Sequence, residues 1–141
     1  MSDAAPAAGP ARASFRNPET MHRPTGYTHV VEVTSGRPVY IAGQVALDPS
    51  GAMVGKGDVR AQARQVFENL RAALEAVGAG FDQVVKLNLY LLDASQLPVV
   101  REVRDQYVNT SQPPASTAVE VGRLVLDDLL VEVEAVAIVD G

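Results

Sequence analysis

The sequence predicts a single α+β domain with the element order β-β-β-α-β-α-β-β, in which two helices pack on one face of a mixed sheet. Three observations support this prediction. A helical stripe of apolar residues spans 59–77, and an alternating strand pattern spans 84–92. The chain has 141 residues, of which 47% are hydrophobic, and this length suits one core.

The first strands are predicted from short apolar runs separated by turn residues. Residues 27–33 and 39–42 read as a hairpin, and residues 43–47 could continue its second strand. The turn residues Asp48 to Gly51 then lead to a brief strand at 52–54. These segments would give three antiparallel strands before the first helix.

The two helices are predicted from apolar spacing and from their ends. In the first, the stripe begins after Asp58, a possible cap, and ends before Gly78. The second is expected from about Leu97 to Val108, with Ser95 as its possible cap.

The remaining strands complete the order. Residues 84–92 follow a helix, which suggests a crossover connection, and the last two strands are expected at 116–121 and 130–139. We expect residues 1–22 to form a flexible tail and residues 23–141 to form the domain.

The sheet is predicted to have an apolar second face. Apolar side chains fall on both faces of the last strand, yet two helices can cover only one face. Burial against other copies of the chain is the economical answer, so we expect a homo-oligomer.

Composition excludes several classes of function. Seventeen acidic residues against twelve basic ones, without a basic run, argue against a nucleic-acid partner. The chain has no cysteine, and its two histidines, His22 and His29, lack a metal-binding spacing, so we expect neither metal nor cofactor. No segment reads as a membrane span or a secretory signal, and we expect a cytoplasmic protein.

Several local motifs together resemble one known family. They are Gly26-Tyr27-Thr28-His29, Ile41-Ala42-Gly43-Gln44, residues 62–69, Val84-Val85-Lys86, Pro114-Ala115-Ser116-Thr117 and Glu132-Val133-Glu134-Ala135. Across residues 23–139 the chain resembles the RidA/YjgF family, also named endoribonuclease L-PSP-like. The resemblance implies a chorismate-mutase-like fold and a homotrimer with an inner β-barrel and ligand clefts between subunits.

The resemblance also implies an activity. The family hydrolyses imines and enamines derived from amino acids to 2-oxo acids and ammonia, without a metal or organic cofactor. An arginine binds the substrate carboxylate, and a water held by a glutamate attacks the imine carbon. Glu132 stands at the position of that glutamate, and Glu134 is a candidate structural partner. A purely structural role, as a glutamate facing water on a strand, is the alternative for Glu132.

The chain departs from the family pattern at three positions of the same pocket. Ser116 stands at the position of the arginine and can offer a single neutral hydrogen bond in place of an ionic fork. Ala118 and Ala42, the latter before Gly43, replace residues that usually carry polar groups or a thiol. We therefore expect a changed ligand and weak activity on 2-iminobutanoate-like substrates.

Three more residues are candidates for ligand binding. Tyr27 or His29 takes the place of the family's cleft tyrosine, and Asn88 is either a cleft residue or an exposed strand residue. Two functions follow as hypotheses. One is water addition to a small imine, enamine or related carbonyl compound, and the other is a non-catalytic trimer that binds a small ligand or a partner. The acidic charge disfavours RNA cleavage.

Overall fold

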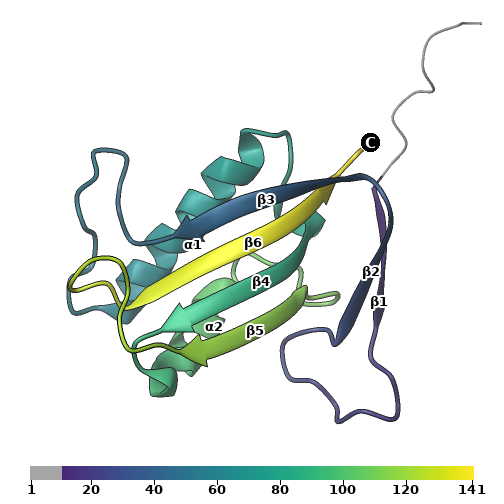
Figure 1. Cartoon of the computed structure of the whole chain (residues 1–141), viewed down its shortest axis with the longest axis horizontal. Coiled ribbons are helices and arrows are strands. Elements are labelled where there is room, and N and C mark those ends of the chain that lie inside the picture. The colour runs from purple at the N-terminus through teal and green to yellow at the C-terminus, as the bar shows by residue number, and fades with distance from the viewer. Residues whose placement is uncertain (1–10) are drawn as a thin grey trace, which may run out of the picture.

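The computed structural model describes residues 11–141. Its main body is a four-stranded sheet with two helices on one face, and a separate two-stranded ribbon projects from one end (Figure 1). The elements are β1 (Arg12–Arg16), β2 (Val30–Ser35), β3 (Arg37–Gln44), α1 (Val59–Glu75), β4 (Val84–Leu91), α2 (Leu97–Arg104), β5 (Ala115–Glu120) and β6 (Val131–Val139).

The sheet is mixed, with the strand order β3-β6-β4-β5. β6 pairs antiparallel with both β3 and β4, whereas β5 pairs parallel with β4. The β4–α2–β5 segment is therefore a crossover unit that places α2 against the sheet beside its β5 edge. These features confirm the predicted α+β fold with both helices on one face.

Helix α1 begins and ends where the sequence predicts. The carboxylate of Asp58 accepts a hydrogen bond of 3.1 Å from the backbone N–H of Ala61. Gly78 adopts a positive φ of 72°, and the N–H of Ala79 bonds back to the carbonyl of Leu74 at 2.9 Å.

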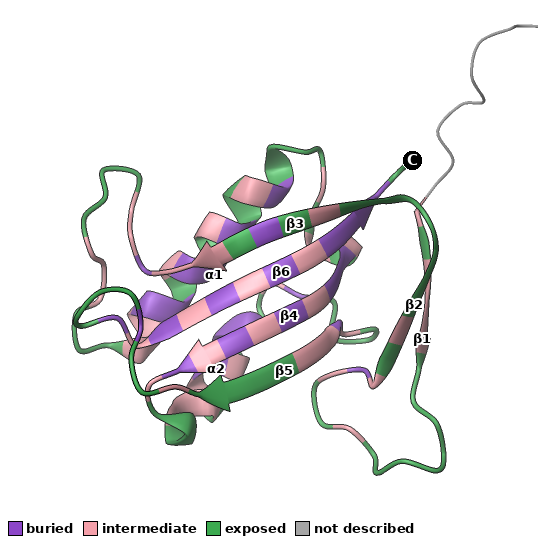
Figure 2. Cartoon of the chain, in the orientation of Figure 1, coloured by how far each residue is buried: buried purple, intermediate pink, exposed green. Residues whose placement is uncertain are grey.

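The core lies between the sheet and the helices. Side chains fully removed from solvent come from α1 (Val66, Phe67, Leu70, Leu74), α2 (Val100, Val103), β4 (Leu87) and β6 (Val131, Val133, Ala137). Burial of each large aliphatic or aromatic side chain contributes about 1.5–3 kcal/mol. Figure 2 shows the resulting alternation of buried and less buried residues along β4 and β6.

Two amides on α1 hold neighbouring loops. Gln62, which has no exposed surface, donates to the carbonyls of Gly55 and Asp128 and accepts from the N–H of Leu130. Asn69 donates to the carbonyls of Val45 and Leu47. The buried face of α1 therefore fixes the chain entering β6 as well as the core.

The second helix is shorter than predicted. A 3-10 turn at Ala94–Gln96 precedes α2, and Asp93 caps this turn by accepting from the N–H of Ser95 at 2.9 Å. The expected cap at Ser95 is therefore wrong. Beyond Arg104 the chain continues in turns, with the N–H of Val108 still bonded to the Arg104 carbonyl at 3.0 Å.

The first strands differ most from the prediction. Only Gly36 separates β2 from β3, whereas a hairpin commonly needs at least two linking residues. β2 pairs instead with β1, which lies inside the predicted tail. At 52–54 a single bridge between Leu47 and Met53 replaces the expected third strand. The predicted element order holds, but with a different set of first strands.

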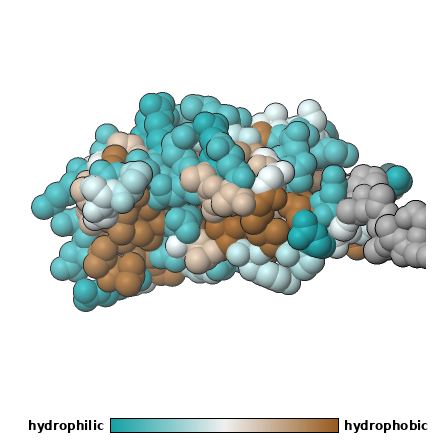
Figure 3. All heavy atoms as spheres, turned by 90° about the horizontal axis from the view of Figure 1, so that it is seen from above, coloured by the Kyte–Doolittle hydropathy of each residue, from teal (hydrophilic) through white to brown (hydrophobic). Residues whose placement is uncertain are grey.

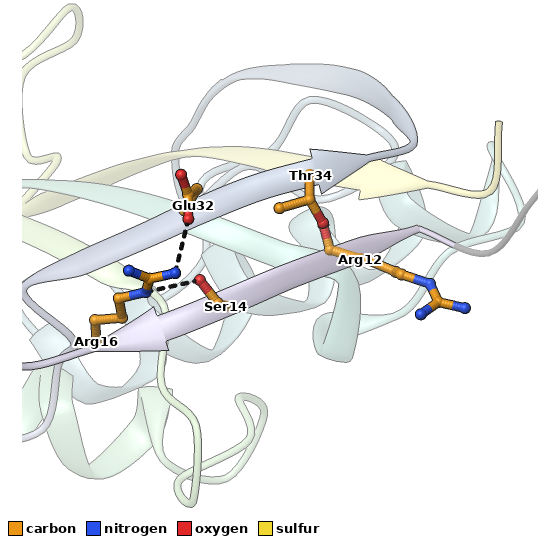
Figure 4. A network of polar contacts seen from close by, with 5 residues as sticks. All are labelled: Arg12, Ser14, Arg16, Glu32 and Thr34. Atoms are coloured by element: carbon orange, nitrogen blue, oxygen red, sulfur yellow. Dashed lines mark hydrogen bonds and ion pairs between the residues drawn. The ribbon is translucent and has the colours of Figure 1, made fainter.

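Side-chain contacts reinforce the β1–β2 ribbon. Arg16 forms an ion pair of 3.0 Å with Glu32 and donates from Nε to the hydroxyl of Ser14, while the hydroxyl of Thr34 donates to the carbonyl of Arg12 (Figure 4). Residues 12–16 are thus ordered as a strand. The rest of the predicted tail up to residue 10 lies outside the described residues.

The sheet face away from the helices is uncovered in the single chain. Tyr40 of β3 is 78% exposed and Val119 of β5 is 42% exposed. Seen from above, the molecule shows patches of hydrophobic residues on an otherwise mostly hydrophilic surface (Figure 3). We call the sheet face away from the helices, which carries Tyr40 and Val119, the open face.

Candidate functional site

The loop before β2 is hydrogen-bonded to the residues just before β5. Thr28 is 2% exposed, and its N–H donates to the carbonyl of Pro114 at 3.2 Å. Its hydroxyl donates to the carbonyl of Pro113. These bonds place Tyr27, the preceding residue, beside the β5 edge.

The Tyr27 ring is held by the two histidines. Its hydroxyl shares a hydrogen bond of 2.9 Å with Nε2 of His22, and the His29 ring packs edge-on against it at 5.4 Å. Nε2 of His29 donates to the carbonyl of His22 at 2.7 Å. Of the two alternatives, Tyr27 lines a cavity, whereas His29 contacts the Tyr27 ring and is not one of the residues that line this cavity.

A cavity of about 240 Å³ lies between β5, α2 and Tyr27. We call it the β5 cavity, and its lining residues are Tyr27, Leu89, Leu97, Arg101, Arg104, Ser116 and Ala118. Ser116 and Ala118 are two residues apart on β5 and therefore face the same side of the strand. Because both side chains are small, the strand leaves space in front of the helix.

Two arginines of α2 line this cavity. Arg104 is 3% exposed, and its Nε and Nη2 donate to one oxygen of Asp105 at 3.1 and 2.9 Å. Gly26, with φ of 73°, passes so close that a side chain there would collide with Arg104. Arg101 is half-buried, and within residues 11–141 its guanidinium has no carboxylate partner.

Neither arginine was predicted as a site residue. A signal was present, because Leu97, Arg101, Arg104 and Val108 recur at intervals of four, three and four residues and so share one helical stripe. The apolar residues of α2 were enough to predict the helix, so nothing in the sequence required a role for either arginine.

A second group of predicted residues lies on the open face. The pairing of β3 with β6 is irregular between Ile41 and Gln44, so Ala42 and Gly43 form a bulge. A Cβ atom at Gly43 would overlap the carboxylate of Glu132. Among residues 11–141 no group donates a hydrogen bond to that carboxylate, which is therefore free to bind water.

One oxygen of Glu134, two residues along, already accepts two hydrogen bonds. It accepts hydrogen bonds from the hydroxyl of Tyr90 at 2.6 Å and from Nδ2 of Asn88 at 2.9 Å. These bonds, the Tyr90 bond first, hold the pKa of Glu134 below its ordinary value of 4.5. The bond to Glu134 also raises the pKa of Tyr90 above 10.0. Asn88 therefore faces Glu134 on the open face and does not line the β5 cavity.

The predicted site residues thus fall into two groups, and these groups are not adjacent within a single chain. Glu132, with Ala42 and Gly43, lies on the open face of β3 and β6. Tyr27, Ser116 and Ala118 lie on the helix side of the β5 edge. Strand β4 separates β6 from β5 in the sheet.

Two larger cavities lie elsewhere on the described chain. One, of about 520 Å³, is on the open face, where Ala42, Asn88 and Glu134 line it. The other, of about 680 Å³, lies near Asp58 and Asp93, but both carboxylates already cap helical turns. Residues 11–141 contain no group of three or more His, Asp or Glu residues arranged for a metal ion. No helix in this part of the chain is long and apolar enough to cross a bilayer.

Comparisons with known proteins agree with this architecture. Residues 20–139 match the family model described as Endoribonuclease L-PSP. A RutC family protein of Pyrococcus horikoshii is 40% identical over 120 residues, which cover 84% of this chain and 92% of the relative. A mouse protein named 2-iminobutanoate/2-iminopropanoate deaminase is 38% identical over 112 residues, covering 79% of this chain and 80% of the relative.

A solved structure is also similar. The crystal structure of a protein of unknown function of the conserved Rid family, YyfB from Yersinia pestis, superposes with a TM-score of 0.80 at 36% identity. The match covers 90% of this chain and 98% of that one.

Proposed function

Because the chain belongs to the RidA/YjgF family, whose model is described as Endoribonuclease L-PSP, we propose that it adds water to a small imine, enamine or related carbonyl compound. The observation that carries this proposal is the free carboxylate of Glu132 above Gly43. Its neighbour Glu134 already accepts bonds from Tyr90 and Asn88 on Oε1, whereas among the described residues both oxygens of Glu132 are available to a water. The naming of a mouse relative as an imine deaminase supports the same reaction class.

The proposed reaction is metal-free hydrolysis. Glu132 accepts a hydrogen bond from a water and orients its oxygen toward the carbon of a protonated C=N group. A C–O bond forms while the π electrons of C=N move to nitrogen, and the water proton passes to the carboxylate. That proton then passes to the nitrogen of the adduct. The adduct hydroxyl loses its proton to the Glu132 carboxylate as the oxygen lone pair forms C=O, and the C–N bond breaks with its electron pair leaving on nitrogen. A carbonyl compound and ammonia are released, and the ammonia takes the remaining proton from Glu132 and leaves as ammonium.

The site is proposed to be completed by self-association. Glu132 and the β5 cavity lie on different sides of the sheet in one chain, so a shared cleft needs one group from each of two neighbouring copies. A homotrimer built through the open face would provide this arrangement and would cover Tyr40 and Val119. We therefore place the clefts between subunits.

Ser116 limits the proposed substrates. Its hydroxyl can make one neutral hydrogen bond, whereas an arginine at this position would bind a carboxylate through two charge-assisted bonds. We therefore propose that 2-iminobutanoate and 2-iminopropanoate are poorer substrates for this chain than for a relative with arginine there.

The test compares Glu132→Gln with the wild type. Release of the carbonyl product is followed from freshly generated 2-iminobutanoate and from a neutral imine of similar size. Loss of a positioned base typically lowers a rate by a factor of about 100 or more, and we expect that loss in Glu132→Gln. Glu75→Gln, an exposed site on α1, is the control that removes the same charge elsewhere and should keep wild-type turnover.

Other outcomes would change the proposal. Equal turnover in wild type and Glu132→Gln would remove Glu132 from the reaction. Saturable binding of these compounds without turnover by the wild type would favour the non-catalytic ligand-binding trimer on the same scaffold.

A further inference from the structure

We propose that Arg101 of α2 is the anion-binding residue of the β5 cavity and gives it a preference for carboxylate ligands. The role of Arg101 rests on the proposed function for the reaction. It concerns helix α2, which faces β5 across the cavity, and not Glu132 of β6. Strand β5 brings only Ser116 and Ala118 to the cavity, neither of which carries charge. The positive charge comes from the facing helix.

Arg101 has the properties that this role needs. It lines the cavity, it is half-buried, and within residues 11–141 no carboxylate is paired with its guanidinium. A guanidinium stays protonated at all physiological pH values and presents several N–H donors in one plane. Partial burial strengthens its attraction for an anion relative to a fully solvated arginine.

Arg104 has a different role because its charge is already compensated. Two of its nitrogens donate to Asp105, and its side chain is 4% exposed. A Cβ atom built at Gly26 would come within 2.7 Å of its guanidinium, so this loop lies close to Arg104. Arg104 therefore packs beside the loop carrying Tyr27 and is not the uncompensated cation of the cavity.

The lining of the cavity suits a small carboxylate. Tyr27 and Ser116 supply neutral hydroxyl groups, and Leu89, Leu97 and Ala118 supply apolar surface. A volume of about 240 Å³ holds a ligand of only a few heavy atoms beside these groups. The carboxylate would be held from the α2 side, and the apolar part of the ligand would lie along Leu89 and Leu97.

The experiment measures binding apart from turnover. The probes are 2-oxobutanoate and 2-butanone, which have the same ethyl ketone portion and differ in a carboxylate against a methyl group. Their dissociation constants are measured by calorimetry or ligand-observed NMR for the wild type and for Arg101→Met. Arg64→Met, exposed on α1, is the control with the same change of net charge.

We expect the wild type and Arg64→Met to bind 2-oxobutanoate about tenfold or more tightly than 2-butanone, because a charge-assisted hydrogen bond typically contributes that much. Arg101→Met should lose this preference and leave binding of 2-butanone unchanged. Arg101→Gln, which keeps hydrogen-bond donors without charge, is the second variant in case Arg101→Met does not fold.

An unchanged preference in either folded Arg101 variant overturns the proposal, as does a wild type that binds both probes equally. Glu132→Gln separates this result from the proposed reaction. It should lose turnover while it keeps carboxylate binding. If instead it keeps turnover while Arg101→Met loses carboxylate binding, the reaction proposal fails and the role of Arg101 stands.

Discussion

Gly43 is present because the carboxylate of Glu132 occupies the space where a side chain would lie. In Gly43→Ala the new methyl group would displace this carboxylate from the bulge. We expect turnover to fall about tenfold or more, because misplacement by an ångström is costly in a positioned site. We also expect a loss of about 1–3 kcal/mol in the free energy of unfolding.

The measurement for Gly43→Ala is release of carbonyl product, with urea unfolding alongside. Gly122→Ala is the matched control, because nothing lies within 4 Å of a Cβ atom built there. Unchanged turnover in Gly43→Ala would show that the Glu132 carboxylate need not remain where the structure places it.

Ser116 and Arg101 line the same cavity, so the positive charge can be moved from position 101 to position 116 by exchanging the two residue types. Ser116→Arg alone would bring a third guanidinium beside Arg101 and Arg104, and we expect this variant to be less stable by about 1–3 kcal/mol. Arg101→Ser should lose its preference for 2-oxobutanoate over 2-butanone. The double variant Ser116→Arg/Arg101→Ser should recover the preference, since it restores one cation to the cavity from the β5 side. A double variant that binds like Arg101→Ser would mean that the cation cannot be moved.

The sequence could predict one wall of this cavity and not the other. Tyr27, Ser116 and Ala118 were found through motif positions on the loop and on β5, and the structure brings them together. Arg101 and Arg104 were missed because a charged residue on a short helix usually faces solvent. Their approach to Ser116 depends on how α2 packs over β5, which is a tertiary property.

Gln62 of helix α1 holds two neighbouring loops in place through its side-chain hydrogen bonds. Gln62→Leu keeps nearly the same shape but leaves the carbonyls of Gly55 and Asp128 and the N–H of Leu130 without their partner. Because an unpaired buried polar group costs about 1–3 kcal/mol, we expect a loss of at least about 2 kcal/mol in the free energy of unfolding.

Urea unfolding measures this loss. Gln106→Leu, at an exposed position without a side-chain hydrogen bond in the described structure, should change the midpoint little. Equal midpoints for the two variants would show that the hydrogen bonds of Gln62 do not stabilise the fold.

Strands β4 and β6 are linked by the hydrogen bonds of Glu134 to Tyr90 and Asn88. The folded-state pKa of Glu134 lies below 4.5, so its ionised form favours the folded state. This contribution is fully present above pH 4.5 and is lost as the pH falls through the lower folded-state value. Glu134→Gln should therefore be less stable than wild type near neutral pH, and the difference should shrink in acid.

Urea midpoints at about pH 7 and about pH 3 test this expectation, with Glu75→Gln as the exposed control. A stability difference that is the same at both pH values would assign the effect of Glu134→Gln to lost packing instead of charge.

Elements with a strong local pattern were predicted well. The ends of α1 were correct because Asp58 and Gly78 act through short-range bonds. The alternation in β4 and β6 likewise marks strands by itself. The pairing of β2 with β1 was not predictable in this way, because a strand partner is chosen by contacts outside the local sequence.

The whole molecule has a helix-covered face and an open face, and this asymmetry bears on assembly. A single chain leaves Glu132 and the β5 cavity on different surfaces. It also leaves Tyr40, on an edge strand, 78% exposed. If copies associate through the open face, one arrangement accounts for both the exposed apolar surface and the divided site.

Tyr40→Asp tests that arrangement. We expect the wild type to have about three times the 14.9 kDa mass of one chain, measured by light scattering after size exclusion. A carboxylate placed in a buried interface would be desolvated without a partner, so Tyr40→Asp should shift the protein toward the monomer. Val125→Asp is the control, because Val125 is 72% exposed on the loop before β6 and not on the sheet.

The same variants connect assembly to activity. If the clefts are shared, monomeric Tyr40→Asp should lose turnover even though Glu132 and Arg101 are both intact, while Val125→Asp keeps both trimer and turnover. A wild type that is monomeric and active would place the whole reaction within one chain. In that case Glu132 could not act on a ligand in the β5 cavity, and the two groups would have to be assigned to separate functions.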